Sequence, residues 1–196
     1  MTRFLDIFFS SIGLIVLLPL FLVVGLWIKI DSKGPFFYKQ KRVGKNNIDF
    51  SLYKFRSMII DADKKGLLLT VGGRDPRVTK SGYFIRKYKI DELPQLINVL
   101  KGDMSLVGPR PEVRKYVDMY NDEQKKVLTV RPGITDYASI EYVNENNILS
   151  VSDNPEKTYI EEIMPAKIAL NMKYINHQSL KEYFKIIFLT INQVVK

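Results

Sequence analysis

Two adjacent carboxylates, Asp91 and Glu92, are the side chains of this sequence best suited to chemistry. At the positive end of a helix, and with Arg86 nearby in sequence, such a pair can supply a nucleophile and a metal ligand together. The arginine and the free amides of a helix N-terminus can also hold phosphate. Taken alone, however, Asp91 is explained better as a helix N-cap, because Pro94 then falls in the first turn, where its missing N–H is harmless.

Composition limits the chemistry further. The 196 residues include no cysteine, which excludes disulfides, thiolate catalysis and zinc sites built on cysteine. The single histidine, His177, cannot form a metal site with other imidazoles, and we interpret it as a packed or exposed side chain near the C-terminus. A net charge of +9 favours anionic partners, of which nucleic acid, an anionic membrane surface and phosphorylated substrates are the three candidates.

An uncharged apolar segment over residues 7–28 precedes the carboxylates in the chain. As a helix rising about 1.5 Å per residue, it could cover the roughly 30 Å hydrocarbon core of a bilayer. It is long for a signal peptide and is not followed by a small-residue cleavage site. Trp27 suits the membrane interface, and the positive-inside rule places the rest of the chain in the cytoplasm, because the segment is followed by Lys29, Lys33, Lys39, Lys41, Arg42 and Lys45.

Pro19 lies in the middle of this segment and cannot donate a hydrogen bond to the carbonyl of Ile15, so the helix should kink or break there. One interpretation is a kinked helix that spans the bilayer once, with Met1 outside. The other is a re-entrant hairpin with both ends in the cytoplasm. Only Arg3 marks the N-terminal flank, and the residues themselves leave both interpretations open.

The elements that must position the carboxylates follow from turn signals and apolar periodicity. Chain length and composition fit one small domain without repeats or linkers. We expect two short strands over 36–38 and 50–53, joined by a turn at 44–47, and a polar loop over 61–76. Helices are expected over 92–101, with Gly102 as the stop, over 112–127, and from Ser179 onward.

The last of these helices carries a wide apolar stripe. In a soluble protein that stripe would pack against the core. In a chain that is already anchored, a position in the membrane interface is equally reasonable, because Lys181 and Lys185 flank an apolar arc that Ile186 and Leu189 widen.

Six blocks of the sequence, in order, resemble the small monotopic phosphoglycosyl transferases of the bacterial sugar transferase family. They begin with Gly-Pro-Phe-Phe-Tyr-Lys-Gln and include Asp-Glu-Leu-Pro-Gln and Gly-Pro-Arg-Pro-Glu. A lone Gly-Pro-Arg-Pro would be weak support, but six ordered blocks are strong. They extend from the end of the apolar segment to Thr135, over residues 34–44, 54–58, 75–79, 91–95, 102–112 and 131–135.

The resemblance implies a fold in the α+β class. Residues 1–30 would form a re-entrant membrane helix broken at Pro19, and residues 31–196 a compact cytoplasmic catalytic domain. That domain would contain a short β-hairpin, several helices, and amphipathic helices that associate with the membrane interface. Many relatives have Ser-Pro at the break where this chain has Leu18-Pro19, so the proline is kept and the serine is not.

The resemblance also implies a reaction at the bacterial inner membrane, in the first membrane step of glycan or glycoconjugate assembly. Asp91 would attack the sugar-linked phosphate of a UDP-sugar, expel UMP and carry the phosphosugar covalently, while Glu92 holds Mg²⁺. Undecaprenyl phosphate, or another polyprenol phosphate, would then displace Asp91. A covalent step suits these substrates, because the water-soluble donor and the lipid acceptor need never meet.

Phosphate or substrate binding is implied for further residues of the matching blocks. An anionic phosphate repels a carboxylate nucleophile, so cations must neutralise it. The residues concerned are Lys54, Arg56, Arg86, Pro109, Arg110, Pro111 and Arg131.

Two other functions fit parts of the sequence. A membrane-tethered module for nucleic acid or acidic partners would explain the charge but has no use for Asp91 and Glu92, so we expect no nucleic acid partner. An inactive subunit of a glycan assembly complex would keep the motifs, yet no catalytic position is substituted. A homo-oligomer is compatible with the sequence. Residues 136–165 depart from the family pattern, so the resemblance does not identify the sugar.

Overall fold

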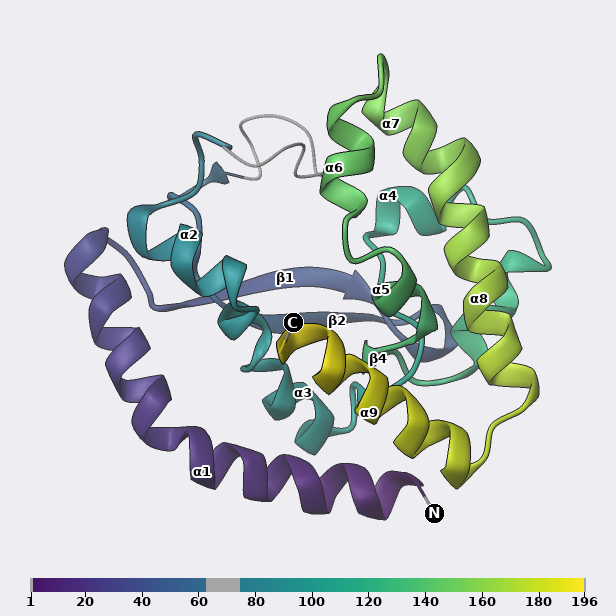
Figure 1. The fold of residues 1–196 in the computed structure, drawn as a ribbon, viewed down its shortest axis with the longest axis horizontal. Coiled ribbons are helices and arrows are strands. Elements are labelled where there is room, and N and C mark those ends of the chain that lie inside the picture. Colours follow the sequence, from purple (N-terminus) through teal and green to yellow (C-terminus); the bar gives the residue numbers. More distant parts are fainter. Residues whose placement is uncertain (1, 63–74, 196) are drawn as a thin grey trace.

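The computed structural model describes residues 2–62 and 75–195 and combines many helices with two small sheets (Figure 1). This arrangement confirms a mixed helix and strand architecture. In chain order the elements are α1 Thr2–Asp31, β1 Phe37–Val43, η1 Lys45–Asn47, β2 Asp49–Phe55, α2 Lys80–Lys87, η3 Ile90–Glu92, α3 Gln95–Lys101, β3 Ser105–Val107, α4 Arg114–Val117, η4 Gln124–Thr129, β4 Gly133–Thr135, α5 Tyr137–Glu141, α6 Glu145–Ser150, α7 Pro155–Thr158, the π-helical turn η5 Tyr159–Ile163, α8 Met164–Asn176 and α9 Leu180–Val195.

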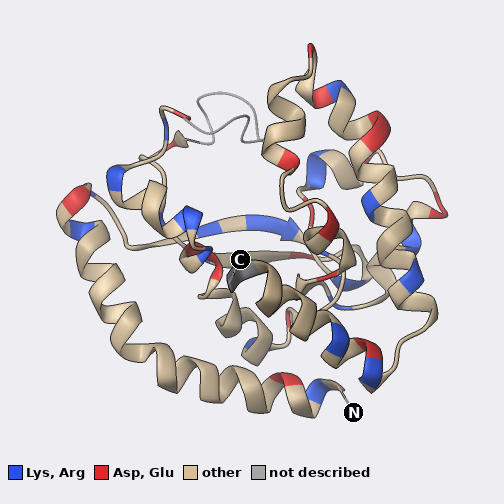
Figure 2. Cartoon of the chain, in the orientation of Figure 1, with Lys and Arg blue, Asp and Glu red and all other residues tan. Residues whose placement is uncertain are grey.

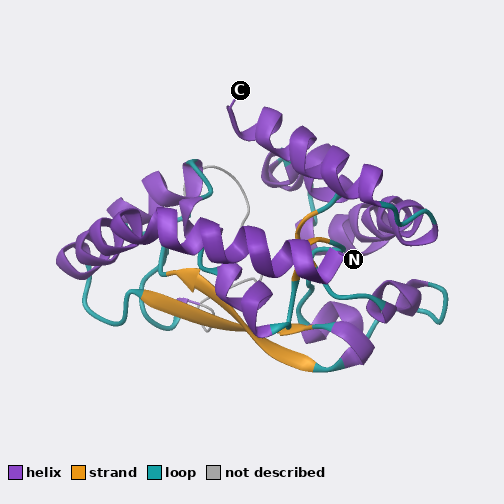
Figure 3. Cartoon of the chain, turned by 90° about the horizontal axis from the view of Figure 1, so that it is seen from below, coloured by secondary structure: helices purple, strands orange, loops and turns teal. Residues whose placement is uncertain are grey.

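The antiparallel hairpin of β1 and β2 is the larger sheet, paired from Phe37 opposite Phe55 to Val43 opposite Asp49. Its turn contains Asn46 at φ 57°, in the left-handed region that asparagine tolerates better than most residues. The hairpin and its turn were predicted from the sequence, and the structure confirms both. Most of the helical mass lies on one side of the hairpin (Figure 3).

A parallel pairing of β3 and β4 fixes the turn that follows β3. The two backbones approach closely at Gly108 and Gly133, where a Cβ on Gly133 would lie 2.1 Å from the nitrogen of Gly108. Only glycine fits this contact. This close contact therefore fixes the position of the backbone at Gly108, where the Pro109-Arg110-Pro111 turn begins.

Helix α1 continues through Pro19, so the break in the helix expected at this residue is absent from α1. The helix instead curves around the domain, and its charged residues lie only near its two ends (Figures 1 and 2). Within residues 2–62 and 75–195, it is the one helix long and apolar enough to cross a membrane. The side chains of Ile15, Val16, Leu22 and Ile30 are at least two-thirds exposed. An isolated soluble domain would not leave so much apolar surface in water.

Both ends of α1 are hydrogen-bonded to the same domain. At the N-terminal end, Arg3 donates to the carbonyls of Val99 and Leu100, at 2.5 and 2.9 Å. The carboxylate of the buried Asp6 accepts from the backbone of Leu106 at 3.0 Å and from the hydroxyl of Tyr183 at 2.8 Å.

At the C-terminal end of α1, Asp31 accepts hydrogen bonds from the backbone and hydroxyl of Ser81, at 2.9 and 2.8 Å. The guanidinium of Arg56 donates to the carbonyl of Ser32 at 2.7 Å and to that of Lys33. The helix is thus held at both ends by one compact unit.

Two expected helices have different boundaries in the structure. The helix expected over 92–101 begins at Gln95 and ends, as predicted, at Gly102, which adopts φ 94°. The expected helix over 112–127 is wrong, since α4 and η4 are separate. Asn121 and Gln124 each accept the backbone N–H of the other at 2.9 Å, a reciprocal cap that starts a new helical turn.

The remaining expectations concern the loop over 61–76 and the last helix. Residues 63–74 of that loop lie outside the described part of the chain. The last helix is confirmed as α9. Part of its apolar stripe packs in the core and part is exposed, because Tyr183 and Ile186 are fully buried while Phe188 and Ile191 are more than half exposed.

Candidate active site

A cavity of about 1590 Å³ lies between the hairpin, α2 and the C-terminal helices. Both carboxylates of the sequence motif line it, as do Lys54, Arg86 and the Pro109-Arg110-Pro111 turn. These residues come from β2, α2, η3 and the turn after β3. Most of the predicted site residues are therefore brought together by the fold.

The carboxylates stand on a tight connection between α2 and α3. Lys89 takes a left-handed conformation at φ 56°, and the single 3-10 turn η3 follows it. Helix α3 then begins at Gln95, after Pro94, and no side chain among the residues described caps it. The N-cap interpretation of Asp91 is therefore wrong. Instead, Asp91 is buried, and its Oδ1 has no hydrogen-bond partner among the described residues. An unsatisfied buried carboxylate oxygen is costly and is typical of a functional site.

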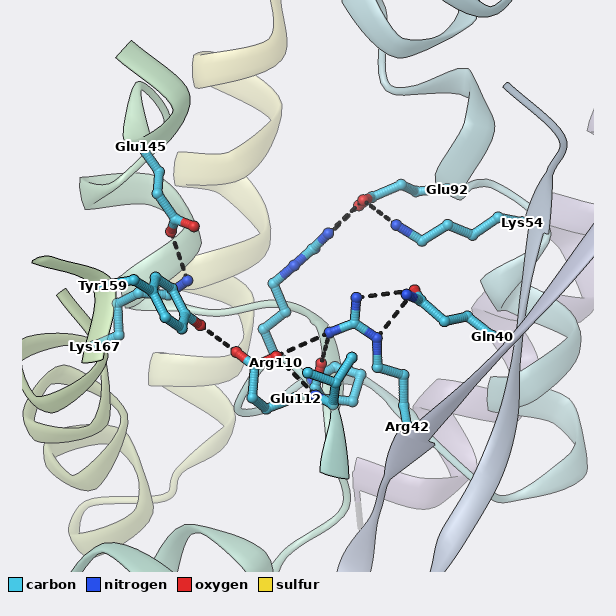
Figure 4. A network of polar contacts seen from close by, with 11 residues as sticks. Gln40, Arg42, Lys54, Glu92, Arg110, Glu112, Glu145, Tyr159 and Lys167 are labelled. Carbon is cyan, nitrogen blue, oxygen red and sulfur yellow. Dashed lines mark hydrogen bonds and ion pairs between the residues drawn. The ribbon is translucent and has the colours of Figure 1, made fainter. Parts of the chain in front are cut away.

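Glu92 is bound by two cations in the same cavity (Figure 4). Lys54 Nζ donates to its Oε1 at 3.0 Å, and Arg110 Nη1 donates to its Oε2 at 3.1 Å. Arg110 Nη2 makes a second bond to Oε1. The fork of the guanidinium thus grips the carboxylate with both nitrogens, the arrangement that gives arginine its geometric selectivity for carboxylate and phosphate.

The two neighbouring carboxylates titrate in opposite directions. Burial raises the pKa of Asp91, and the charge of Glu92 raises it further, against the opposing effect of Lys54. Burial also raises the pKa of Glu92, but Arg110 and Lys54 outweigh it and hold that pKa well below its usual range. Adjacent acids whose environments separate their pKa values are a mark of acid–base or nucleophilic sites.

A second polar network adjoins this pair and was not predicted from the sequence (Figure 4). Arg42 donates to Glu112 Oε1 at 3.2 Å and to the carbonyl of Pro111 at 3.0 Å. The hydroxyl of Tyr159 donates to the other oxygen of Glu112. Glu112 belongs to the matching block 102–112 and could have been predicted as a site residue from that block. Tyr159 lies in the unmatched region, where no motif identifies it.

Two predicted phosphate ligands are not brought to the carboxylates. Arg56 borders the cavity, but its guanidinium is committed to the C-terminal end of α1. Arg131 donates to the carbonyl of Gly102 at 2.9 Å on the exposed surface. Lys54 and Arg56 are two positions apart, a spacing that puts side chains on the same face of a strand. Arg56 lies just past the end of β2 at Phe55, however, and its guanidinium is bonded to Ser32 and Lys33 instead.

The chemistry of the carboxylate pair is compatible with Mg²⁺. Within the described residues no three histidine or acidic side chains gather into a metal cage. Mg²⁺ does not need one, because it usually binds through one or two carboxylates together with substrate phosphates. Asp91 offers an unpartnered oxygen, whereas Glu92 would have to share its oxygens with Lys54 and Arg110.

An exposed apolar surface, here called the apolar face, extends from α1 to residues that line the cavity. Ring contacts join its parts, with Trp27 packed on Phe84 of α2 at 5.3 Å and Phe9 on Phe184 of α9 at 6.3 Å between centroids. The face consists of exposed residues of α1, α2 and α9 with Tyr88, and its exposed members include Phe4, Ile15, Val16, Leu22, Val23, Leu26, Trp27, Phe84, Tyr88, Phe184, Phe188 and Ile191. Tyr88 and Ile191 also line the cavity, so the apolar face and the cavity share these two residues.

Comparison with known proteins gives the family. The sequence profile described as "Bacterial sugar transferase" matches residues 1–196. The chain belongs to the bacterial sugar transferase family. The resemblance drawn from the six blocks is thereby confirmed.

Several members of the bacterial sugar transferase family match almost all of this chain. The UDP-N-acetylgalactosamine-undecaprenyl-phosphate N-acetylgalactosaminephosphotransferase of Aeromonas hydrophila is 40% identical over 98% of this chain and 43% of its own length. The galactosyl transferase CpsE of Streptococcus agalactiae is 44% identical over 98% and 42%. The UDP-glucose:undecaprenyl-phosphate glucose-1-phosphate transferase of Escherichia coli is 35% identical over 95% and 38%. The chain thus spans about two fifths of the length of these relatives.

Proposed function

We propose that this bacterial sugar transferase moves a phosphosugar from a UDP-sugar to undecaprenyl phosphate and releases UMP. The names of its relatives support these substrates. The observation that carries the mechanism is the buried Asp91, whose Oδ1 lacks a partner among the described residues and which stands beside a carboxylate held by two cations. The reaction would be the first membrane step of glycan assembly.

In the first step, the carboxylate of Asp91 attacks the phosphorus that carries the sugar. A carboxylate–phosphorus bond forms, the bond to the bridging oxygen breaks, and UMP leaves with that oxygen. In the second step, a phosphate oxygen of undecaprenyl phosphate attacks the same phosphorus and releases the Asp91 carboxylate. Neither step requires a net proton transfer, so the site needs charge neutralisation more than a general base.

The cations of the cavity supply that neutralisation. Lys54 and Arg86 both favour the ionised form of Asp91, which is the nucleophilic form. The bidentate contact with Glu92 orients the guanidinium of Arg110, which contributes positive charge to the same cavity. Glu92 would hold Mg²⁺, which when bound adds positive charge next to the donor phosphates.

The attachments of α1 support a re-entrant topology. A helix that spans the bilayer would carry its first residues to the far side, about 30 Å away. Here Arg3 and Asp6 are bonded to the same domain as Asp31. We therefore propose that α1 enters the bilayer and returns near Pro19. The parts of the apolar face on α2 and α9 would rest on the cytoplasmic surface of the inner membrane, with the catalytic domain of residues 31–196 in the cytoplasm.

The absence of cysteine from the sequence allows a clean test of this topology. Thr2→Cys introduces one thiol at an exposed position, and Ser150→Cys provides a matched control on the catalytic domain. In intact inverted and right-side-out vesicles, an impermeant maleimide should label both thiols from the cytoplasmic side. Labelling of Thr2→Cys only from the opposite side would show that α1 spans the membrane.

The reaction itself is tested by UMP release from detergent-solubilised protein with Mg²⁺, undecaprenyl phosphate and a panel of UDP-sugars. Wild type should release UMP with at least one donor, and Asp91→Asn should release none while keeping its thermal unfolding midpoint. Removal of Mg²⁺ with EDTA should also stop release. UMP release that survives in Asp91→Asn would reject the proposed nucleophile.

A further inference from the structure

The Pro109-Arg110-Pro111 turn carries the guanidinium that faces the carboxylate pair, yet its own backbone offers few ways to hold it. Two of its three residues are prolines, which lack the N–H group, so its carbonyls supply most of its possible hydrogen bonds. The carbonyl of Pro109 accepts from the backbone N–H of Gly133 at 2.9 Å. The carbonyl of Pro111 accepts from Nη1 of Arg42 at 3.0 Å. The side chain of Arg42 is therefore one of the supports of the turn.

The guanidinium of Arg42 is itself held through all three of its nitrogens (Figure 4). Gln40 Oε1 accepts from Nε at 3.1 Å and from Nη2 at 2.9 Å. Nη1 also donates to Glu112 Oε1 at 3.2 Å. The side chains of Arg42 and Glu112 are only 18% and 17% exposed. An ion pair so little exposed to solvent is favourable only when its other polar atoms are also hydrogen-bonded.

Tyr159 supplies one of these hydrogen bonds from the region that departs from the family pattern. Its hydroxyl donates to Oε2 of Glu112, the oxygen that Arg42 does not contact. Tyr159 is 3% exposed and begins the π-helical turn η5, a rare element that is frequent at functional sites. Its ring packs on the ring of Tyr116 at 4.9 Å between centroids, and Lys167 Nζ lies 5.6 Å from its centroid. Packing thus holds the hydroxyl against Glu112.

Arg42 and Arg110 are close enough to influence each other's charge. Burial lowers the pKa of Arg42, the charge of Glu112 opposes this effect, and the charge of Arg110 lowers the pKa further. Glu112 therefore offsets the repulsion between two neighbouring arginines. If Glu112 loses the hydroxyl of Tyr159, it is free to turn toward other donors, and Arg42 loses the partner that holds it beside the carbonyl of Pro111.

We propose that Tyr159 is a positioning residue that acts on the guanidinium of Arg110. The action passes through Glu112 and Arg42 to the carbonyl of Pro111. The inference rests on the proposed function, in which Arg110 contributes positive charge to the cavity where phosphate is transferred. It gives part of the region 136–165 a role in the reaction.

Tyr159→Phe tests the proposal, because it removes only the hydroxyl oxygen. In detergent-solubilised full-length protein, kcat for UMP release should fall by about tenfold, while KM for the UDP-sugar stays within about twofold. A small displacement of a group that stabilises the transition state lowers the rate more than it weakens ground-state binding. Tyr116→Phe is the matched control, since Tyr116 belongs to the same core cluster but its hydroxyl lies 3.4 Å from Glu156. It should change neither constant.

A double-mutant cycle with Arg110→Met separates positioning from a merely structural role. If Tyr159 acts through the guanidinium of Arg110, the effect of Tyr159→Phe on the single-turnover rate should shrink from about tenfold to less than about twofold when that guanidinium is absent. Equal losses in both backgrounds would overturn the proposal. A raised KM with an unchanged kcat would also overturn it.

Gln40→Leu provides a second variant in case Tyr159→Phe does not fold. It removes the acceptor of Nε and Nη2 of Arg42, and so loosens the same chain of contacts from β1. The rate should again fall only while Arg110 is present. A loss that is independent of Arg110 would contradict the chain.

Chemical modification of arginine supplies a readout that needs no turnover. The full-length protein is treated with phenylglyoxal, and the rate of modification at Arg110 is followed by peptide mass mapping, with the exposed Arg131 as internal reference. Tyr159→Phe should speed modification of Arg110 by about 3- to 10-fold, the loosening expected from loss of one hydrogen bond, and Tyr116→Phe should not. An unchanged rate would overturn the positioning role. Failure of the proposed function gives a different pattern, in which Arg110 is modified as predicted but wild type releases no UMP.

Discussion

The half of the cavity built by β2 and η3 differs from the half built by α5 and α8 in how its charges are balanced. In the first half, Asp91 is buried with an oxygen that no described residue satisfies, and Glu92 draws two cations to its side. In the second half, Glu145 is paired with a single cation, Lys167, at 2.7 Å. The difference separates a region with an unsatisfied carboxylate and two cations on one acid from a region where an acid and a base are paired one to one.

The largest effect that would sharpen this contrast is expected from Glu92→Gln. Loss of this charge leaves Lys54 and Arg110 partly buried without their shared counter-ion, which typically costs about 3–5 kcal/mol of unfolding free energy. We expect UMP release to fall by about 10²- to 10³-fold, because the cations are no longer aligned. Denaturant unfolding and steady-state kinetics measure the two effects. Glu145→Gln, in the balanced half, serves as the comparison, and equal losses of activity in both variants would abolish the distinction between the halves.

A second prediction separates two cations of a single sequence block, Lys54 and Arg56. Lys54→Met should lower kcat by about 10²-fold with little change in the packing of α1. Arg56→Met removes the hydrogen bonds to Ser32 and Lys33 and should lower the unfolding midpoint instead, with a nearly normal kcat in the folded fraction. Single-turnover rates and thermal unfolding distinguish the two. A stable but inactive Arg56→Met protein would contradict this prediction and indicate that Arg56 acts in the reaction.

A smaller effect is expected from pH. Asp91 acts as its ionised form, and its pKa lies above the ordinary value of 3.8. The rate of UMP release should therefore fall as pH drops toward that raised pKa, with an apparent value above 3.8. The stability contribution of Glu92 is also lost on acidification, but at a lower pH. Its folded pKa lies well below the ordinary 4.5, so that contribution is complete above 4.5 and is lost only as pH falls through the lower value.

A pH–rate profile and acid unfolding curves measure the two windows separately. Glu92→Gln should lack the stability loss below pH 4.5 but keep the acid limb of any remaining activity. An acid limb with an apparent pKa at or below 3.8 would contradict the buried environment of Asp91.

Local sequence signals predicted the parts of the fold that depend on local chemistry. The turn at 44–47 and the stop at Gly102 are such features, because left-handed backbone selects asparagine or glycine. The ordered blocks also selected Lys54, Glu92 and Arg110, which the fold brings into contact.

Features that depend on tertiary contact were not predictable in the same way. The commitment of Arg56 to α1 requires knowledge of where the helix ends in space. The pairing of Glu112 with Tyr159 joins a matching block to the unmatched region, and no periodicity reports it. The split of the expected helix over 112–127 follows from the competing cap of Asn121 and Gln124, which apolar spacing alone does not reveal.

The most direct test of the central claim is the intact mass of the protein after incubation with Mg²⁺ and its preferred UDP-sugar, without undecaprenyl phosphate. The account predicts a mass increase of one phosphosugar, located at Asp91 by peptide mapping and removed when undecaprenyl phosphate is added. Asp91→Asn should show no increase. UMP release that requires the lipid acceptor and never produces an adduct would contradict a covalent role for Asp91 and indicate direct transfer between the two substrates.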